Sequence, residues 1–384
     1  MRSLPQVEER LPGGRLAQAE ALLEDAVRDG QCAGGVVWVQ QDGEVRWHRA
    51  YGWAEMTPRR RAMRAEMVFD LASLTKPLVT VTGILQLWER GVLDLDRPAE
   101  DALPGFGQAG KSAVTIRHLL AHTSGLPAWV RFYLRARTPE EAITGICRTA
   151  PLTPPGSQVT YSDLGFLILG EVLHRHGRHS LDDYTQTHIA PALRWQWTRY
   201  RPPASWREWC VATEVGNEYE RRMAAEAGEG GGFAWRAETI VGEAHDGNCH
   251  YLFEGVSGHA GLFSTAEEVG RYGRALLDGG RGPGGQLLRD ETIAEMSRDQ
   301  SAGAAGEGYG LGWRIARGNR SLFGTTSSTQ AFGHTGFTGT SLVVDPSRAL
   351  VIVLLTNRVH PSVETPRFAA FRQGFHEAVM EAVA

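Results

Sequence analysis

The chain has 384 residues, of which 42% are hydrophobic and 22% charged, with a formal net charge of −4. This composition is typical of a folded protein with a sizeable core, and it excludes disorder, collagen and coiled coil as descriptions of the whole chain. The charge balance gives no sign of nucleic-acid binding. No run reaches the ~18 apolar residues of a membrane span, and the opening MRSLPQVEERLPGG lacks the apolar core of a signal peptide. We therefore expect a cytoplasmic protein without a membrane span or a nucleic-acid partner.

The cysteines give no sign of a metal site or a disulfide scaffold. The four cysteines, Cys32, Cys147, Cys210 and Cys249, lie far apart and include no C-x-x-C pair. That spacing does not fit a zinc knuckle. We expect reduced, mostly buried thiols, and neither a metal nor another cofactor.

The first predicted elements are a helix and a hairpin. Apolar residues recur at helical spacing over 16–29, and the pattern ends at Gly30. Two β-rich runs then follow over 34–52, joined by Asp42-Gly43. Asp-Gly between such runs is a strong hairpin signal.

The rest of the chain predicts helices first and strands last. Helical patterns cover 77–91, 162–177 and 265–279, whereas 340–357 reads as a second hairpin and 367–383 as a closing helix. Strands at both ends with helices between them predict an α/β (α+β) fold. In it, an antiparallel sheet built from both chain ends is flanked by helices and carries an inserted all-helical lobe.

We expect one domain over 1–384 with two lobes. Residues 1–75 and 300–384 would build the sheet lobe, and 76–299 the mainly helical lobe.

One segment matches the P-loop pattern in its letters only. Residues 105–112 read GFGQAGKS, which fits the phosphate-binding P-loop pattern. A P-loop must follow a buried strand and open a helix, but the preceding DRPAEDALP is polar and interrupted by proline. We interpret this stretch as a surface loop and Lys111 as a surface lysine.

Lys76 is the other of only two lysines, and it lies three residues after Ser73 in LASLTKP. Positions i and i+3 share a helix face, so the hydroxyl and the amine can meet. Pro77 fits the first turn of a helix that begins near Ser73. These residues suggest a serine nucleophile whose proton passes to a neutral, partly desolvated lysine. Ser73 as a simple helix cap is the alternative.

Two further triplets support this chemistry. Tyr161-Ser162-Asp163 opens an apolar helix, and its phenol could relay a proton to the leaving group. His334-Thr335-Gly336 directly precedes the second hairpin. A small residue on an edge strand lets a substrate backbone approach closely.

The order S-x-x-K, Y-x-[ND], [KH]-T-G resembles the serine β-lactamase and penicillin-binding-protein superfamily. The chain looks closest to class C β-lactamases and the related esterases and D-peptidases. The segments TIRHLLAHTSGLP, YSDLGFLILG, GVSGHAGLFSTAEE and FGHTGFTGTSLVVDP are also similar to that family, so the resemblance covers roughly residues 16–380.

The resemblance implies catalytic roles for four residues. Ser73 would be the nucleophile, and Lys76 and Tyr161 would share the general-base and general-acid work. The N–H groups of Ser73 and Phe337 would form the oxyanion hole, where aligned donors lower the barrier.

It also implies a substrate-binding set. Asp163 would orient the substrate amide and Lys76, while His334 and Thr335, followed by Gly336, would line the side that takes the substrate carboxylate. Many family members have Asn where Asp163 stands, and a carboxylate there favours the charged form of Lys76. Many have Lys where His334 stands, and a partly charged His anchors a carboxylate more weakly. Both departures weaken the expectation of β-lactam hydrolysis more than that of acyl-enzyme chemistry.

Other polar residues receive structural interpretations. His259-Ala260-Gly261 precedes a turn into a helix, and His122 ends one. The resemblance implies that the loop 241–248 (VGEAHDGN) forms a wall of the cleft. Trp313 could reach the cleft rim.

We therefore predict a serine hydrolase that acts through an acyl-enzyme on a small ester or amide. Carboxylester, β-lactam and D-aminoacyl peptide hydrolysis all remain open, and the sequence leaves the oligomeric state open. The alternatives are an acyltransferase of the same fold, a non-catalytic penicillin-binding-like protein and, less well supported, a P-loop NTPase.

Overall fold

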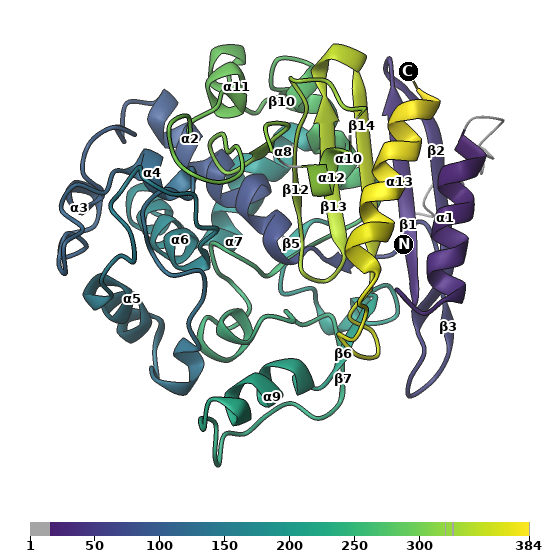
Figure 1. Cartoon of the computed structure of the whole chain (residues 1–384), viewed down its shortest axis with the longest axis horizontal. Coiled ribbons are helices and arrows are strands. Elements are labelled where there is room, and N and C mark those ends of the chain that lie inside the picture. Colours follow the sequence, from purple (N-terminus) through teal and green to yellow (C-terminus); the bar gives the residue numbers. More distant parts are fainter. Residues whose placement is uncertain (1–15, 319, 325, 384) are drawn as a thin grey trace.

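The computed structural model describes residues 16–318, 320–324 and 326–383. The opening stretch on which the signal-peptide prediction rests lies outside the described residues. The structure has two parts (Figure 1). One is a twisted sheet with helices on both faces, and the other is a mainly helical lobe beside it. The predicted fold class is confirmed.

Seven strands form the main sheet in the order β11-β12-β13-β14-β1-β2-β3, and every pairing is antiparallel. The strands are β1 (Gly34–Gln41), β2 (Glu44–Glu55), β3 (Arg61–Ala62), β11 (Arg314–Ile315), β12 (Phe332–Thr335), β13 (Thr340–Asp345) and β14 (Leu350–Thr356). β1 pairs with β14 in the register Trp38↔Val353, which joins the two ends of the chain at the centre of the sheet. Both predicted hairpins are present, and Asp42 and Gly43 adopt the positive φ angles of 51° and 81° that the first one needs.

The continuous apolar run Val36–Val39 in β1 explains why helices cover both faces of the sheet, because successive side chains of a strand point to opposite faces. Val37 and Val39 pack with α1 (Ala17–Arg28) and α13 (Phe368–Ala382), whereas Val36 and Trp38 belong to the larger core on the other face. α10 (Ala266–Leu277) packs on that second face, against β1, β13 and β14. All three helices match the helical patterns in the sequence.

The lobe between the sheet segments is helical apart from one small three-stranded sheet and two strand pairs. Its helices are α2 (Thr82–Glu89), α3 (Ala99–Ala102), α4 (Ile116–Leu120), α5 (Pro139–Arg148), α6 (Asp163–Gly177), α7 (Leu181–Tyr184), α8 (Ala190–Leu193), α9 (Glu218–Glu226) and α11 (Asp290–Ser297), and the short α12 (Arg320–Phe323) lies by the sheet. The strands are β4 (Phe69–Asp70), β5 (Arg199–Tyr200) and β8 (Leu262–Ser264), β6 (Ala212–Val215) with β7 (Thr239–Val241), and β9 (Arg281–Gly282) with β10 (Gly285–Gln286). α6 is the buried central helix of this lobe, with nine buried residues, and this burial fits the apolar pattern that predicts it.

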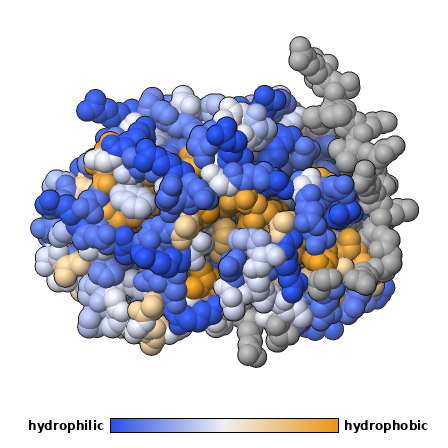
Figure 2. Space-filling view, turned by 90° about the horizontal axis from the view of Figure 1, so that it is seen from above, coloured by the Kyte–Doolittle hydropathy of each residue, from blue (hydrophilic) through white to orange (hydrophobic). Residues whose placement is uncertain are grey.

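The surface has no dominant apolar face in the view from above, where apolar residues show in several separate areas among hydrophilic ones (Figure 2). Within the described ranges, no helix has both the length and the apolar character needed to span a bilayer. All four cysteines are buried free thiols, as predicted.

Candidate active site

Ser73 sits on a tight turn between β4 and the buried helical run that ends in α2. The turn is a 3₁₀ helix over Ala72–Leu74, and Ala72 has a φ of +47°. The buried carboxylate of Asp70 fixes this turn, since it accepts hydrogen bonds from the backbone N–H of Ala72 (2.8 Å) and of His245 (2.7 Å). Burial raises the pKa of Asp70, and these two N–H groups partly oppose the rise. Ser73 is thereby held at the wall of a cavity of about 580 Å³.

Lys76 follows Ser73 on the same helical run, in a wider π-helical turn over Lys76–Val81. Its side chain is fully buried, and Nζ lies 3.0 Å from Ser73 Oγ. Nζ also donates to the carbonyl of His259 (3.1 Å) and lies 2.6 Å from Oδ1 of Asp163. The i, i+3 spacing therefore brings the hydroxyl and the amine together as expected.

The charge of Lys76 differs from the expectation. Burial lowers its pKa, but the opposing attraction of Asp163 and the neighbouring Tyr161 outweighs burial, so the pKa of Lys76 is raised above its ordinary value of 10.5. The resting lysine is therefore an ammonium, not the neutral amine that the sequence suggested. The cause is the carboxylate at position 163, the departure already noted in the sequence.

Tyr161 lies directly before α6, whose first turn is capped by the Ser162 hydroxyl, an acceptor for the Gly165 N–H (3.3 Å). The centre of its ring is 4.9 Å from Lys76 Nζ. Its hydroxyl is buried without a hydrogen bond of normal geometry. Burial raises the pKa of Tyr161, and the Lys76 ammonium opposes this rise only in part, so the resting phenol is protonated.

The turn that carries Phe337 is tied to the serine turn by two threonines. Thr338 Oγ1 donates to the carbonyl of Asp70 (2.7 Å), and Thr340 Oγ1 donates to that of Leu71 (3.0 Å). At Gly336 a Cβ would lie 2.4 Å from the Leu71 carbonyl oxygen. The absence of a side chain at Gly336 thus lets its turn approach the backbone at Leu71, just before Ser73. The sequence analysis had instead explained the small residue by close approach of the substrate backbone. The short β11 pairs with Phe332 and Gly333 of β12, and this pairing does not extend to His334 and Thr335.

His334 lies one layer behind the cavity wall that Thr335, Gly336 and Phe337 help to form. Its ring centre is 5.8 Å from that of Tyr161, and its Nε2 is buried without a partner in the described structure. Burial, followed by repulsion from Lys76 and Arg314, holds the pKa of His334 well below its usual range. The expectation that His334 itself faces a substrate carboxylate is corrected accordingly, since the side chain is neutral and packs against Tyr161.

His122 packs on another side of Tyr161, with ring centres 4.5 Å apart. Its Nδ1 accepts the N–H of Ser162 (3.0 Å). Burial also holds the pKa of His122 well below the usual range. These contacts support its structural interpretation.

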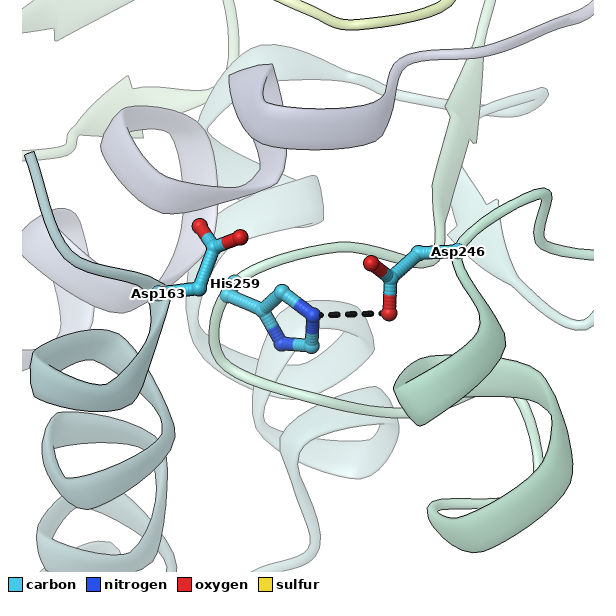
Figure 3. Close-up of side chains that lie close together, drawn as sticks. All are labelled: Asp163, Asp246 and His259. Atoms are coloured by element: carbon cyan, nitrogen blue, oxygen red, sulfur yellow. Dashed lines mark hydrogen bonds and ion pairs between the residues drawn. The ribbon is translucent and has the colours of Figure 1, made fainter. Parts of the chain in front are cut away.

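His259 has a larger part in the site than the sequence suggested. Figure 3 shows its imidazole between Asp163, at the start of α6, and Asp246, with a hydrogen bond to Asp246 (2.9 Å). Its other ring nitrogen lies 2.9 Å from the Ser257 hydroxyl. Burial raises the pKa of Asp246, but the attraction of His259 outweighs burial and brings that pKa to about 2.

The side chains of Asp163, Asp246 and His259 offer ligand atoms within 4.8 Å of one another, which is compatible in distance with a metal ion. However, both nitrogens of His259 are already engaged, and Asp163 is paired with the Lys76 ammonium. A divalent cation would have to displace these contacts, so the donor set does not fit a resident metal.

Both acidic and basic side chains line the cavity. The acidic ones are Asp163, Asp246 and Glu220 of α9, and the pKa of Glu220 is raised to about 7 by burial and then by the nearby Asp246. The lining also includes three arginines and several aromatic side chains: Arg314, Arg358, Arg372, Trp129, Tyr219, Phe337 and Phe368. The family resemblance implied the loop 241–248 as a wall, and His245 and Asp246 do line the cavity. It gave no signal for Glu220, Arg358 or Arg372.

Two other expectations are wrong. Trp313 is fully buried and donates to Met296 Sδ (3.1 Å), so it does not reach the rim. Lys111 is fully buried as well, and its Nζ donates to the carbonyls of Gln108, Cys147 and Thr149 at 2.7–2.8 Å. The segment 105–112 is a series of turns with no strand before it, so it lacks P-loop geometry.

Comparison with known proteins gives consistent matches. The family model described as Beta-lactamase matches residues 19–373. An N-acetylmuramyl-L-alanine amidase of Bacillus subtilis (strain 168) is 30% identical over 381 residues, covering 92% of this chain and 83% of that protein. A putative D-alanyl-D-alanine carboxypeptidase of Salmonella typhimurium is 30% identical over 354 residues, covering 86% of this chain and 79% of that protein.

Solved structures agree in fold. EstCE1, described as a hydrolase with promiscuous acyltransferase activity, superposes with a TM-score of 0.74 at 23% identity, covering 95% of this chain and 98% of its own. A class C beta lactamase from Rhodobacter sphaeroides superposes with a TM-score of 0.72 at 19% identity, covering 96% of this chain and 99% of its own.

Proposed function

Because the chain belongs to the Beta-lactamase family, we propose that it is a serine hydrolase that cleaves a small ester or amide through a covalent acyl-enzyme on Ser73. One observation carries the proposal: Ser73 Oγ lies 3.0 Å from the buried Nζ of Lys76 at the wall of a cavity. A hydroxyl needs such a basic neighbour to become a nucleophile.

In the acylation step, Ser73 Oγ attacks the substrate carbonyl carbon, and the Oγ proton passes to Lys76. Lys76 can accept it only in its neutral form, so the active fraction of the enzyme is set by the ion pair with Asp163. Tyr161, protonated at rest, donates its proton to the leaving alcohol or amine as the carbonyl–heteroatom bond breaks. The protonated Lys76 then returns a proton to the Tyr161 oxygen.

The oxyanion would be bound by the backbone N–H groups of Ser73 and Phe337. The hydrogen bonds from Thr338 and Thr340 to the segment before Ser73 support this assignment, since they fix the two donor segments relative to each other. Donors held in place before the reaction stabilise the transition state without a reorganisation cost.

In the deacylation step, a water attacks the acyl carbon, its proton passes to the neutral Lys76–Tyr161 pair, and Ser73 Oγ regains a proton as the acyl bond breaks. The cavity of about 580 Å³ fits a small substrate. The relatives described as an amidase and a carboxypeptidase support amides as substrates beside esters.

The test is hydrolysis of a nitrophenyl ester by the Ser73→Ala variant, followed by a panel of esters, β-lactams and D-aminoacyl amides with the unchanged enzyme. Ser73→Ala is expected to abolish turnover and to keep the melting temperature. The matched control is Ser297→Ala, which removes a hydroxyl that bonds within α11 and should leave turnover unchanged. Full activity of Ser73→Ala would refute the proposal.

A further inference from the structure

His245 lines the cavity that contains Ser73, and the acylation step does not use it. It lies in the loop 241–248, and its side chain is almost fully buried. Its backbone N–H donates to the carboxylate of Asp70 (2.7 Å), which also holds the serine turn. Its ring stacks on that of Phe337, with ring centres 5.6 Å apart and an angle of 23° between the planes. The imidazole is therefore held beside the two turns that carry the proposed oxyanion donors.

A buried glutamate fixes the tautomer of this ring. Nε2 of His245 lies 2.9 Å from Oε2 of Glu214, which belongs to β6 and is also buried. The other carboxylate oxygen of Glu214 accepts the backbone N–H of Tyr219 (2.8 Å). Since a carboxylate accepts hydrogen bonds, the neutral ring carries its proton on Nε2, and Nδ1 keeps its lone pair.

Nδ1 of His245 is left free for a group in the cavity. Within the described part of the chain it has no hydrogen-bond partner, and unlike Nε2 of His334 it is not closed off from solvent. His259 is the opposite case, because both of its ring nitrogens are engaged. A ring nitrogen that a carboxylate orients and that is open to a cavity has the arrangement of a general base.

The second half of the reaction has a use for such a base. The water that attacks the acyl-enzyme must give up a proton as it bonds to carbon. Lys76 is held in its protonated form by the ion pair with Asp163. An acceptor outside that ion pair lets the water lose its proton without first breaking it.

We propose that His245, oriented by Glu214, is the general base for the water that releases the acyl group from Ser73. The inference rests on the proposed function, because it concerns its deacylation step. As the water oxygen bonds to the acyl carbon, the water proton passes to Nδ1. The bond from that carbon to Ser73 Oγ then breaks, and Oγ takes a proton from the Lys76–Tyr161 pair. The proton on His245 then replaces that proton through water in the cavity.

The test follows the acetyl-enzyme formed from 4-nitrophenyl acetate, by rapid quenching and intact-protein mass spectrometry. His245→Gln keeps an amide N–H for Glu214 and removes the basic nitrogen. The variant is expected to acylate at the unchanged rate and to lose the acetyl group about 10²–10⁴-fold more slowly. Steady-state kcat and KM should fall together, so that kcat/KM stays unchanged. A merely structural role of His245 would lower kcat/KM as well.

Glu214→Gln tests the tautomer. The Tyr219 N–H holds the amide oxygen of the new side chain, so the amide NH₂ faces Nε2 of His245 and donates to it. The ring proton then lies on Nδ1, which can no longer accept one. This variant should also slow deacylation and leave acylation unchanged. The matched control is His250→Gln, because His250 lies 3.6 Å from a carboxylate oxygen of Glu243 and outside the cavity wall. Its kinetics should be those of the unchanged enzyme.

Hydroxylamine separates a missing base from a distorted site. It attacks an acyl-enzyme without the help of a general base, so it should speed the turnover of His245→Gln and Glu214→Gln at least tenfold and add little to the unchanged enzyme. Circular dichroism and melting temperature confirm that the variants are folded, and either variant alone decides the question.

The outcomes separate this inference from the proposed function. If His245→Gln loses its acetyl group at the unchanged rate, or if its kcat/KM falls as much as its kcat, His245 is not the base, and Ser73 remains the nucleophile. If no acetyl group forms on Ser73 in any of these proteins, the proposed function is refuted and the role of His245 with it.

Discussion

The ammonium of Lys76 lies 2.6 Å from the carboxylate of Asp163, and the lysine side chain is fully buried whereas that of Asp163 is 17% exposed. The same ammonium contacts the Ser73 hydroxyl. The group that has to accept a proton from Ser73 is therefore held in its protonated form by its neighbour. This relationship makes the activity depend on pH in a way that one substitution can change.

Asp163→Asn should move the acidic limb of the pH–rate profile to lower pH. The carboxylate raises the pKa of Lys76, so in the unchanged enzyme kcat/KM rises with pH into the alkaline range as Lys76 loses its proton. Without the carboxylate, the neutral amine forms at lower pH. Each unit by which the pKa falls gives about tenfold more neutral lysine below the limb, so kcat/KM near pH 7 should rise by about tenfold or more.

The profile of kcat/KM against pH for nitrophenyl acetate measures this shift. Asp25→Asn is the control, since it removes an equal charge from an exposed ion pair on α1 and should leave the profile in place. A fall of kcat/KM at every pH in Asp163→Asn would contradict the argument and show that the carboxylate itself takes part in the proton transfer.

Lys76→Arg should lose nearly all activity while keeping the positive charge beside Asp163. A guanidinium does not give up its proton in a protein, so it cannot act as the base, and loss of a general base costs about 10²–10⁴-fold. Single-turnover acylation of the variant measures the effect. A rate within tenfold of the unchanged enzyme would remove Lys76 from the proton transfer.

Gly336→Ala should separate the turn of Phe337 from the turn of Ser73. The new Cβ would lie 2.4 Å from the Leu71 carbonyl oxygen and 2.1 Å from Thr340 Oγ1, so the backbone has to shift. A misplaced oxyanion donor costs about 10²–10³ in kcat. The exposed Gly231 has no atom within 4 Å of such a Cβ, and Gly231→Ala should behave like the unchanged enzyme. Normal kcat in Gly336→Ala would contradict the assignment of Phe337.

Lys111→Met should affect stability and not catalysis. The buried ammonium donates to three backbone carbonyls. Without this charged donor the carbonyls lose their partner, so the free energy of unfolding should fall by about 2–4 kcal/mol. Urea unfolding gives the free-energy change, and kcat at a temperature where the variant is folded should be unaltered. Equal stability of the two proteins would refute the structural role.

Local patterns in the sequence predicted much of this structure. Asp42-Gly43 fixed the first turn because few other dipeptides tolerate two positive φ angles. The Ser73–Lys76 contact follows from helix geometry over three residues. In each case the determining interaction lies within a few positions along the chain.

Long-range contacts explain what the sequence could not predict. His259 and Asp246 lie beside Lys76 and Asp163 only because segments far apart in the sequence meet at the cavity. The three arginines that line it likewise come from β11, the segment after β14 and α13. Lys111 looked like a surface residue because its carbonyl partners include Cys147 and Thr149, more than thirty positions away. The charge of Lys76 likewise depends on a partner in another segment, although the aspartate at position 163 already indicated that the charged form would be favoured.

The central claim is that Ser73 is the nucleophile, and intact-protein mass spectrometry after incubation with a fluorophosphonate tests it most directly. The account predicts one adduct per chain, mapped to Ser73 by peptide digestion and absent from Ser73→Ala. An adduct on another residue, or an unmodified chain that still hydrolyses the nitrophenyl ester, would contradict it.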